Sequence, residues 1–224
     1  MTKLDLELKA IKDETIEMWT LVQSQLQKGL SAILNFDKDL AREIILIEKR
    51  VNGAELKIDR DCEDIFALYT PVAVDLRFLL AVLKINTNLE RMGDIAEGIA
   101  KLILDTDTSF RPDLLESTKV IEMYHESLQI VDEILSAFEK EDSAIARGIF
   151  KRDELLDQIN RNANDLIMEY LKGNPDDINQ ALNILSIIRR LERVGDQSEN
   201  IAEEIIFYIE AKVIKHSKKE NKIE

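Results

Sequence analysis

The chain has 224 residues, 33% of them charged, a formal net charge of −14 and a pI of about 4.7. This charge argues against a general DNA or RNA backbone binder, which needs a basic face. No apolar run approaches the roughly 20 residues of a membrane span, and the first residues lack the apolar region of a signal peptide. The single cysteine, Cys62, excludes an intramolecular disulfide. We therefore expect a cytoplasmic protein.

Apolar residues recur at helical spacing along three long stretches in the first half of the chain. The first stretch runs from about Lys3 to Asn35. The second begins after Asp37, a residue type that caps helices, and ends at Pro71, because the residue before proline avoids helical geometry. The third opens near Asp75 and runs to about residue 104. These stretches predict three long helices.

The polar segment 105–111 has no apolar periodicity and is the predicted linker. Pro112 suits the first turn of a fourth helix, because proline has no backbone N–H to leave unpaired there. Apolar spacing predicts that this helix continues unbroken to about Phe138, followed by a short turn at 139–142.

A fifth helix is predicted from about Ile145 to Leu171, and the sequence Gly173-Asn174-Pro175 is a strong stop signal. The sixth helix is expected from about residue 176 to 215. From Ser217 the chain is charged, and we expect a frayed tail.

A twelve-residue motif occurs twice. Leu89–Ala100 reads Leu-Glu-Arg-Met-Gly-Asp-Ile-Ala-Glu-Gly-Ile-Ala, and Leu191–Ala202 reads Leu-Glu-Arg-Val-Gly-Asp-Gln-Ser-Glu-Asn-Ile-Ala, an offset of 102 positions. Eight of the twelve aligned positions are identical, including polar residues and a glycine, so shared helix composition does not explain the match. We interpret it as an internal duplication. The predicted fold is all-α: two tandem three-helix bundles, residues 1–106 and 107–224, packed along each other or end to end.

The repeated motif carries two carboxylates four positions apart. Such residues lie on one helix face, so Glu90 and Asp94 project side by side, as do Glu192 and Asp196. A cation between two carboxylates removes their repulsion and gains hard oxygen ligands. In both copies a glycine precedes the aspartate, although glycine inside a helix costs roughly 1 kcal/mol against alanine. Close approach of another helix at the glycine would explain this cost.

A second polar stripe lies on the preceding helix of each half, with the spacing 4, 3, 4 in both copies. If neighbouring helices face each other, each bundle brings two acidic stripes together, as in the carboxylate-rich metal sites of helical bundles. The stripe residues are Glu48, Asn52, Glu55 and Asp59 in the first half, and Asp153, Asp157, Asn160 and Asn164 in the second.

Structural salt bridges are the alternative explanation of the acidic pairs. About one residue in five is acidic, so a single pair four apart is weak support for a metal, whereas its repetition with the glycine favours one. The alternative partners would be Arg77, Lys84, Arg152 and Arg189. Catalysis has no positive support: no phosphate-binding glycine loop, nucleophile elbow or kinase motif is present. Only Glu122–His125 fits the Glu-x-x-His pattern that di-iron oxidases need twice.

The sequence resembles the family of phosphate transport system regulatory proteins, PhoU. The resemblance covers essentially the whole chain. It is carried by Pro71–Arg77 leading into Leu89–Asp94, by Leu191–Asp196 with the following Asn-Ile-Ala, and by the closing residues 206–216.

This resemblance implies a fold of two three-helix bundles and a cytoplasmic, non-enzymatic negative regulator of phosphate uptake, often a homodimer. Its implied partners are the phosphate ABC transporter, with its ATPase subunit, and a phosphate-sensing histidine kinase at the membrane. It also implies bound divalent or iron ions, in some members as multinuclear clusters, at acidic pairs that correspond to Glu90/Asp94, Glu192/Asp196, Glu55/Asp59 and Asp153/Asp157.

The chain departs from the acidic pattern at Asn52, Asn160 and Asn164, where a carboxylate would bind metal better. We therefore expect the first half to bind metal more fully than the second. Two other hypotheses remain: a metal-free structural helical adaptor, and a metal-dependent hydrolase, which would need an open coordination position and a general base.

Overall fold

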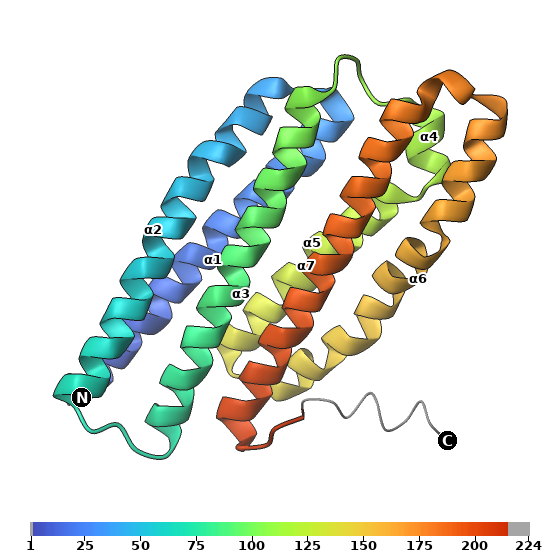
Figure 1. Cartoon of the computed structure of the whole chain (residues 1–224). Helices are drawn as coiled ribbons and strands as arrows, with labels where there is room; N and C mark the ends of the chain where they lie inside the picture. The colour runs from blue at the N-terminus through green and yellow to red at the C-terminus, as the bar shows by residue number, and fades with distance from the viewer. Residues whose placement is uncertain (1, 215–224) are drawn as a thin grey trace, which may run out of the picture.

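The computed structural model describes residues 2–214, and within them it is built of helices without any strand (Figure 1). The first half consists of α1 (Lys3–Asn35), α2 (Lys38–Leu68) and α3 (Val74–Asp105). The all-α prediction and the three helices of the first half are confirmed. No helix within these residues has the length and apolar character needed to cross a bilayer.

The second half repeats the three long helices and adds two short ones. The predicted linker, 105–111, corresponds to the non-helical residues 106–111 that follow α3, while residue 105 is still helical. The helices then follow one another with only short turns between them. They are α4 (Pro112–Ser117), α5 (Val120–Lys140), α6 (Ser143–Gly173), the short 3-10 helix η1 (Pro175–Asp177) and α7 (Ile178–Glu210).

The equivalent helices α2 and α6 both begin with an aspartate N-cap. The Asp37 carboxylate accepts the N–H groups of residues 39 and 40, and the Asp142 carboxylate accepts those of residues 144 and 145. Each aspartate thereby satisfies backbone donors that the first helical turn leaves without a partner. The preceding helices α1 and α5 both end in the left-handed conformation, at Phe36 and Glu141.

Two predicted helix bounds were wrong. The fourth helix is interrupted: the Thr118 hydroxyl donates to the Leu114 carbonyl, Lys119 takes the left-handed conformation with φ 57°, and α5 begins only at Val120. The sixth helix ends at Glu210 rather than near residue 215, because Ala211 is left-handed with φ 57°. The predicted frayed tail lies outside the described residues.

The two bundles lie side by side. Figure 1 shows α3 and α7 running antiparallel in the middle of the molecule, with α2 beside α3 and α6 beside α7. Helices α1 and α5 also pack on each other. The buried apolar side chains of both halves form a single cluster. The predicted division of the chain between residues 106 and 107 therefore separates two sequence repeats that share one hydrophobic core. As a domain boundary it stays a prediction.

Aromatic side chains join the two bundles at one place in that core. Trp19 of α1 lies 5.9 Å from Phe138 of α5, and Phe78 of α3 lies 5.7 Å from Tyr208 of α7 between ring centroids. Phe138 also contacts both Phe78 and Tyr208. One ring from each of four helices thus takes part, which fixes the two halves relative to each other. Cys62 is a free, buried core residue.

Candidate functional site

The acidic stripe of α2 faces that of α3, as predicted. Glu48 of α2 is only 3% exposed. Burial is the main cause that raises its pKa from 4.5 to about 7, a hydrogen bond from Gln25 acts against it, and the charges of Asp94, Glu90 and Glu97 on α3 raise it further. The carboxylates of the two helices therefore act on one another as a single electrostatic unit.

Glu48 is held by one side chain from α1. The Gln25 amide donates from Nε2 to Glu48 Oε2 at 2.7 Å and also reaches the Ile44 carbonyl oxygen at 3.3 Å. The other carboxylate oxygen, Glu48 Oε1, is buried and has no hydrogen-bond partner among the described residues. A buried acceptor without a donor is costly, so this position has unused capacity to bind a proton or a cation.

Gly93 allows this carboxylate to reach the backbone of α3. A Cβ atom at Gly93 would lie 2.5 Å from Glu48 Oε2 and 3.2 Å from both Gln25 Oε1 and Val51 Cγ1. The first of these distances is shorter than any van der Waals contact permits. An alanine in place of the glycine in the first copy of the motif would therefore displace the Glu48 carboxylate of the neighbouring helix.

The second half repeats this contact with a shorter acid. A Cβ atom at Gly195 of α7 would lie 2.0 Å from Asp153 Oδ1 of α6 and 3.2 Å from Asp153 Cγ. Asp153 is buried and corresponds to Glu48 in the acidic stripe. The predicted close approach at the two motif glycines is thus confirmed in both halves, and the atoms that approach are carboxylates.

The remaining acids of the first half lie nearer the surface. Glu55, Asp59 and Glu90 are half-buried, and Asp94 is exposed. Burial raises the pKa of Glu55, with Asp59 and Asp94 contributing, and burial raises the pKa of Glu90, with Asp94 and Glu55 contributing. The structure therefore brings together the four acids predicted for the first site.

An amide from α3 fixes part of this group. Asn86 is fully buried, and its Nδ2 donates at 2.9 Å both to Asp59 Oδ1 and to the Glu55 carbonyl oxygen. Its own carbonyl oxygen, Oδ1, has no hydrogen-bond partner among the described residues. Sequence reasoning missed Asn86 and Gln25 because neither is acidic. The only sequence signal for Asn86 is its position one helical turn before Glu90 on the same helix. The only signal for Gln25 is its place on α1, which packs against α2.

The second half contains a related but weaker group. Burial raises the pKa of Glu192, and the charges of Asp196 and Asp157 add to this effect, while Arg193 opposes it. Asp157 also accepts from Arg161 at a distance of 3.3 Å. The acids predicted for the second site thus lie on facing helices, with a neighbouring cation already compensating one of them.

Three of the four cations proposed as structural partners of the acidic pairs bind other groups. Lys84 pairs with Glu204 at 3.0 Å, Arg77 donates to the Tyr208 carbonyl oxygen, and Arg152 binds Glu126 and Glu133. These cations are therefore engaged away from the repeated motif. The alternative explanation of the acidic pairs loses three of its four proposed partners.

The donor chemistry of the acidic groups fits a hard cation, although no metal cage is already formed. Carboxylate and amide oxygens are ligands that divalent cations and iron accept, and the buried Glu48 Oε1 lacks a donor. Within residues 2–214, however, no three or more His, Cys, Asp or Glu side chains are arranged closely enough to hold a metal ion. Binding would therefore require side-chain rearrangement.

The raised pKa of Glu48 links its charge to stability. The folded chain holds the Glu48 proton more tightly than an unfolded chain would, where the pKa is near 4.5. The stabilising contribution is therefore fully present below pH 4.5 and is lost as pH rises through about 7. At neutral pH and above, ionised Glu48 opposes folding unless a positive charge compensates it.

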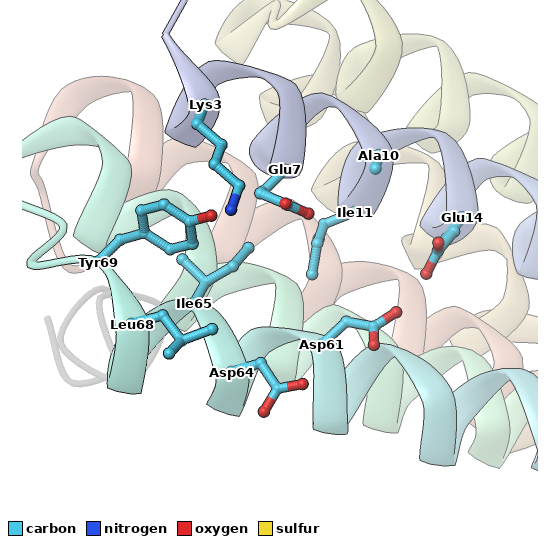
Figure 2. Close-up of a pocket in the computed structure, with 10 residues that line it drawn as sticks. All are labelled: Lys3, Glu7, Ala10, Ile11, Glu14, Asp61, Asp64, Ile65, Leu68 and Tyr69. Carbon is cyan, nitrogen blue, oxygen red and sulfur yellow. The ribbon is translucent and has the colours of Figure 1, made fainter.

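A separate acidic groove, not predicted from the sequence, lies between the start of α1 and the end of α2 (Figure 2). Its volume is about 260 Å³, and Ile11 and Ile65 lie buried beneath it. Lys57 pairs with Glu14 and Asp61 beside it. Four carboxylates face this groove, from Glu7, Glu14, Asp61 and Asp64.

A family model, the PhoU domain, matches residues 15–103 and again residues 120–205. The chain belongs to the PhoU family. A "Phosphate-specific transport system accessory protein PhoU" from Edwardsiella tarda is 32% identical over 210 residues, covering 94% of this chain and 86% of that protein. The protein of the same name from Escherichia coli K12 is 31% identical with the same coverage.

Solved PhoU structures have the same fold. The structure of PhoU from Pseudomonas aeruginosa superposes with a TM-score of 0.84 at 28% identity and covers 94% of this chain and all of that one. A phosphate transport system regulatory protein PhoU from Streptococcus pneumoniae gives 0.82 at 29%, covering 95% and 99%. Each of the two matched PhoU domains contains one glycine–carboxylate contact and one facing pair of acidic stripes.

The glycine contacts predict opposite effects for alanine at two kinds of helical glycine. Gly195→Ala should destabilise the protein, because the buried Asp153 carboxylate must move, and Gly93→Ala should do so less, since Glu48 is longer and more adaptable. Gly53→Ala and Gly148→Ala are matched controls, because no atom lies within 4 Å of the added Cβ. They should stabilise by about 0.5–1 kcal/mol through helix propensity. Urea unfolding measures all four.

Asp153→Ala should reverse the penalty at Gly195. In a double-mutant cycle, Gly195→Ala introduced into Asp153→Ala should no longer destabilise. If alanine at Gly195 is as stabilising as alanine at Gly148 in the wild-type background, the carboxylate contact does not constrain α6 and α7.

Proposed function

We propose that this protein is a non-enzymatic accessory protein of a phosphate-specific transport system that restrains phosphate uptake and the phosphate-starvation response when phosphate is plentiful. The observation that carries the proposal is the match of both halves to the PhoU domain, together with relatives about 30% identical that are named as accessory proteins of such a system.

The partners follow from the same proposal. The protein acts in the cytoplasm with the phosphate ABC transporter, through its ATPase subunit, and with a phosphate-sensing histidine kinase, and it forms a homodimer. It reaches the inner face of the membrane through these partners. The net charge of −14 supports docking on basic protein surfaces, because complementary charge accelerates and orients association.

Within this role, we propose that the facing acidic stripes bind divalent or iron ions. Glu55, Asp59, Glu90 and Asp94 would hold the metal in the first half, and Asp153, Asp157, Glu192 and Asp196 in the second. A bound cation would supply the positive charge that these carboxylates lack. The support is the raised pKa values of Glu48, Glu55, Glu90 and Glu192, which burial raises most and which the repulsion of neighbouring carboxylates raises further.

The protein's own residues limit what such an ion can do. Glu48 lies behind the group, buried against Gly93, where its proton or charge sets the electrostatic balance of the α2–α3 pair. Asn86 orients Asp59. A cation that joins acids from α2 and α3 would therefore make this helix pair more rigid. Partner binding to the α2–α3 face would then depend on the bound ion.

We predict that variants lacking the acidic pairs bind less metal. Glu90→Ala with Asp94→Ala should lower the metal content of protein purified without chelator or histidine tag, and Glu192→Ala with Asp196→Ala should lower it less. The second site has asparagine at positions 160 and 164 in place of acids. Elemental analysis by mass spectrometry makes the measurement.

The matched control is Asp13→Ala with Glu17→Ala, an exposed acidic pair with the same spacing on α1. It removes the same charge from a single helix face and should leave metal content unchanged. Equal metal content in all three double variants would support the alternative, a metal-free helical adaptor, and would leave the phosphate role to be judged separately.

We predict that deletion of the gene causes a defect in phosphate regulation. In high phosphate, cells without the protein should express phosphate-starvation genes and take up excess phosphate, because the restraint is lost. Expression of the wild-type chain should restore repression. Transcript levels of the starvation genes and uptake of radiolabelled phosphate measure the two effects. Unchanged expression and uptake in the deletion strain would contradict the regulatory proposal.

A further inference from the structure

The outer side of α2 is basic, although the chain as a whole has a net charge of −14. Helix α2 lies at the edge of the molecule and packs against α1 and α3, which leaves its remaining side in solvent (Figure 1). Five of the exposed residues there are cations and one is an acid. The exposed residues between positions 42 and 60, called the basic face below, are Arg42, Glu43, Leu46, Lys49, Arg50, Asn52, Gly53, Leu56, Lys57 and Arg60.

Much of the positive charge on the basic face is not compensated. Its one acid, Glu43, already pairs with a lysine of α1. Two of the five cations pair with acids outside the face. The other three, Lys49, Arg50 and Arg60, form no ion pair among residues 2–214. Three cations without an acidic partner therefore point into water from one side of a single helix.

The acidic stripe lies on the opposite side of the same helix. Arg50 and Lys57 each follow an acid of that stripe, Glu48 and Glu55, by two positions. Residues two apart lie about 160° apart around a helix axis. The stripe faces α3, so the carboxylates proposed to bind metal and the basic face point in opposite directions. Substitutions on the basic face therefore leave those carboxylates in place.

The equivalent helix of the second half has no such face. Helices α2 and α6 correspond at an offset of 105 positions, and Glu154 and Asp165 of α6 occupy the positions of Lys49 and Arg60 in α2. An exposed cation of α6, Arg161, pairs with an acid of its own helix. The duplicated helix framework does not by itself produce a basic face, so this charge pattern is specific to α2.

Two leucines accompany the cations. Leu46 is 60% exposed and Leu56 is 64% exposed. Leucine beside lysine and arginine on one helix face is typical of helices that lie on anionic membranes, where cations bind the headgroups and apolar side chains enter the boundary with the acyl chains. A nucleic-acid backbone would use the cations but not the leucines. The composition therefore favours a lipid surface.

A second copy of the chain fits the basic face poorly. In a twofold contact between two antiparallel α2 helices that cross at Gly53, positions equally far from the axis meet. Lys49 of one copy would then lie opposite Lys57 of the other. Like charges placed together repel. The face is thus suited to an anionic surface rather than to itself.

We propose that the basic face docks on the anionic phospholipid headgroups of a membrane, without inserting a helix. The face is about 27 Å long at the rise of an α-helix, so it can contact several headgroups at once. The acids elsewhere in the molecule oppose docking weakly, because charges farther away than about 8 Å are largely screened at physiological ionic strength. The choice of a membrane rests on the proposed function, which places the protein beside a membrane transporter.

Flotation of the purified full chain with lipid vesicles tests the proposal. We expect the protein to float with vesicles of equal parts phosphatidylglycerol and phosphatidylcholine, and not with vesicles of phosphatidylcholine alone. Rising salt should release it, because screening weakens the attraction between the cations and the anionic surface. No other protein takes part in this assay, so its outcome does not depend on the role in phosphate transport.

Lys49→Gln, Arg50→Gln and Arg60→Gln combined should weaken partitioning to the anionic vesicles by about 100-fold, since each cation near such a surface contributes about fivefold. A matched triple variant removes the same charge from exposed positions on other helices and should partition like the wild type. Circular dichroism checks that both triple variants stay helical. The matched variant is Lys140→Gln, Lys151→Gln and Arg189→Gln.

The proposal is overturned if the wild type does not float with the anionic vesicles, the result expected if the basic face instead serves an acidic protein. It is also overturned if the two triple variants partition equally, because net charge and not the face would then decide binding. Either failure leaves the proposed phosphate role standing, since the gene deletion tests that role separately.

Discussion

A buried carboxylate packed on a glycine of the neighbouring helix is the contact on which the acidic face of each half depends. Glu48 reaches α3 at Gly93, and Asp153 reaches α7 at Gly195. Because a Cβ atom at either glycine would collide with the carboxylate, the carboxylate would have to move if the glycine were replaced.

This arrangement places carboxylates close together at a buried position, where both burial and mutual repulsion disfavour their negative charge. Glu48 is deprived of water, and the acids of α3 repel it, so its pKa rises to about 7. Evolution of a stable helical scaffold alone would favour apolar or neutral residues at such positions. We therefore propose that the charge itself has a role in both PhoU domains, and that a bound cation compensates it.

Much of this could be predicted from the sequence. The duplicated motif and the helical periodicity predicted the six long helices, and the glycines predicted close helix approach. The break at Lys119 could not be predicted, because the apolar spacing continues across it and the interruption depends on a left-handed backbone. The buried amides Gln25 and Asn86 were also missed, since only tertiary packing brings them to Glu48 and Asp59.

The most direct test of this account is the pKa of the Glu48 side chain, measured by ¹³C NMR of the carboxyl carbon in metal-free protein with Glu labelling. The account predicts titration near 7, and a fall in that value in Glu90→Ala with Asp94→Ala, because two repelling charges are removed. Titration of Glu48 near 4.5, the usual value for glutamate, would show that the carboxylate is neither buried against Gly93 nor coupled to the acids of α3.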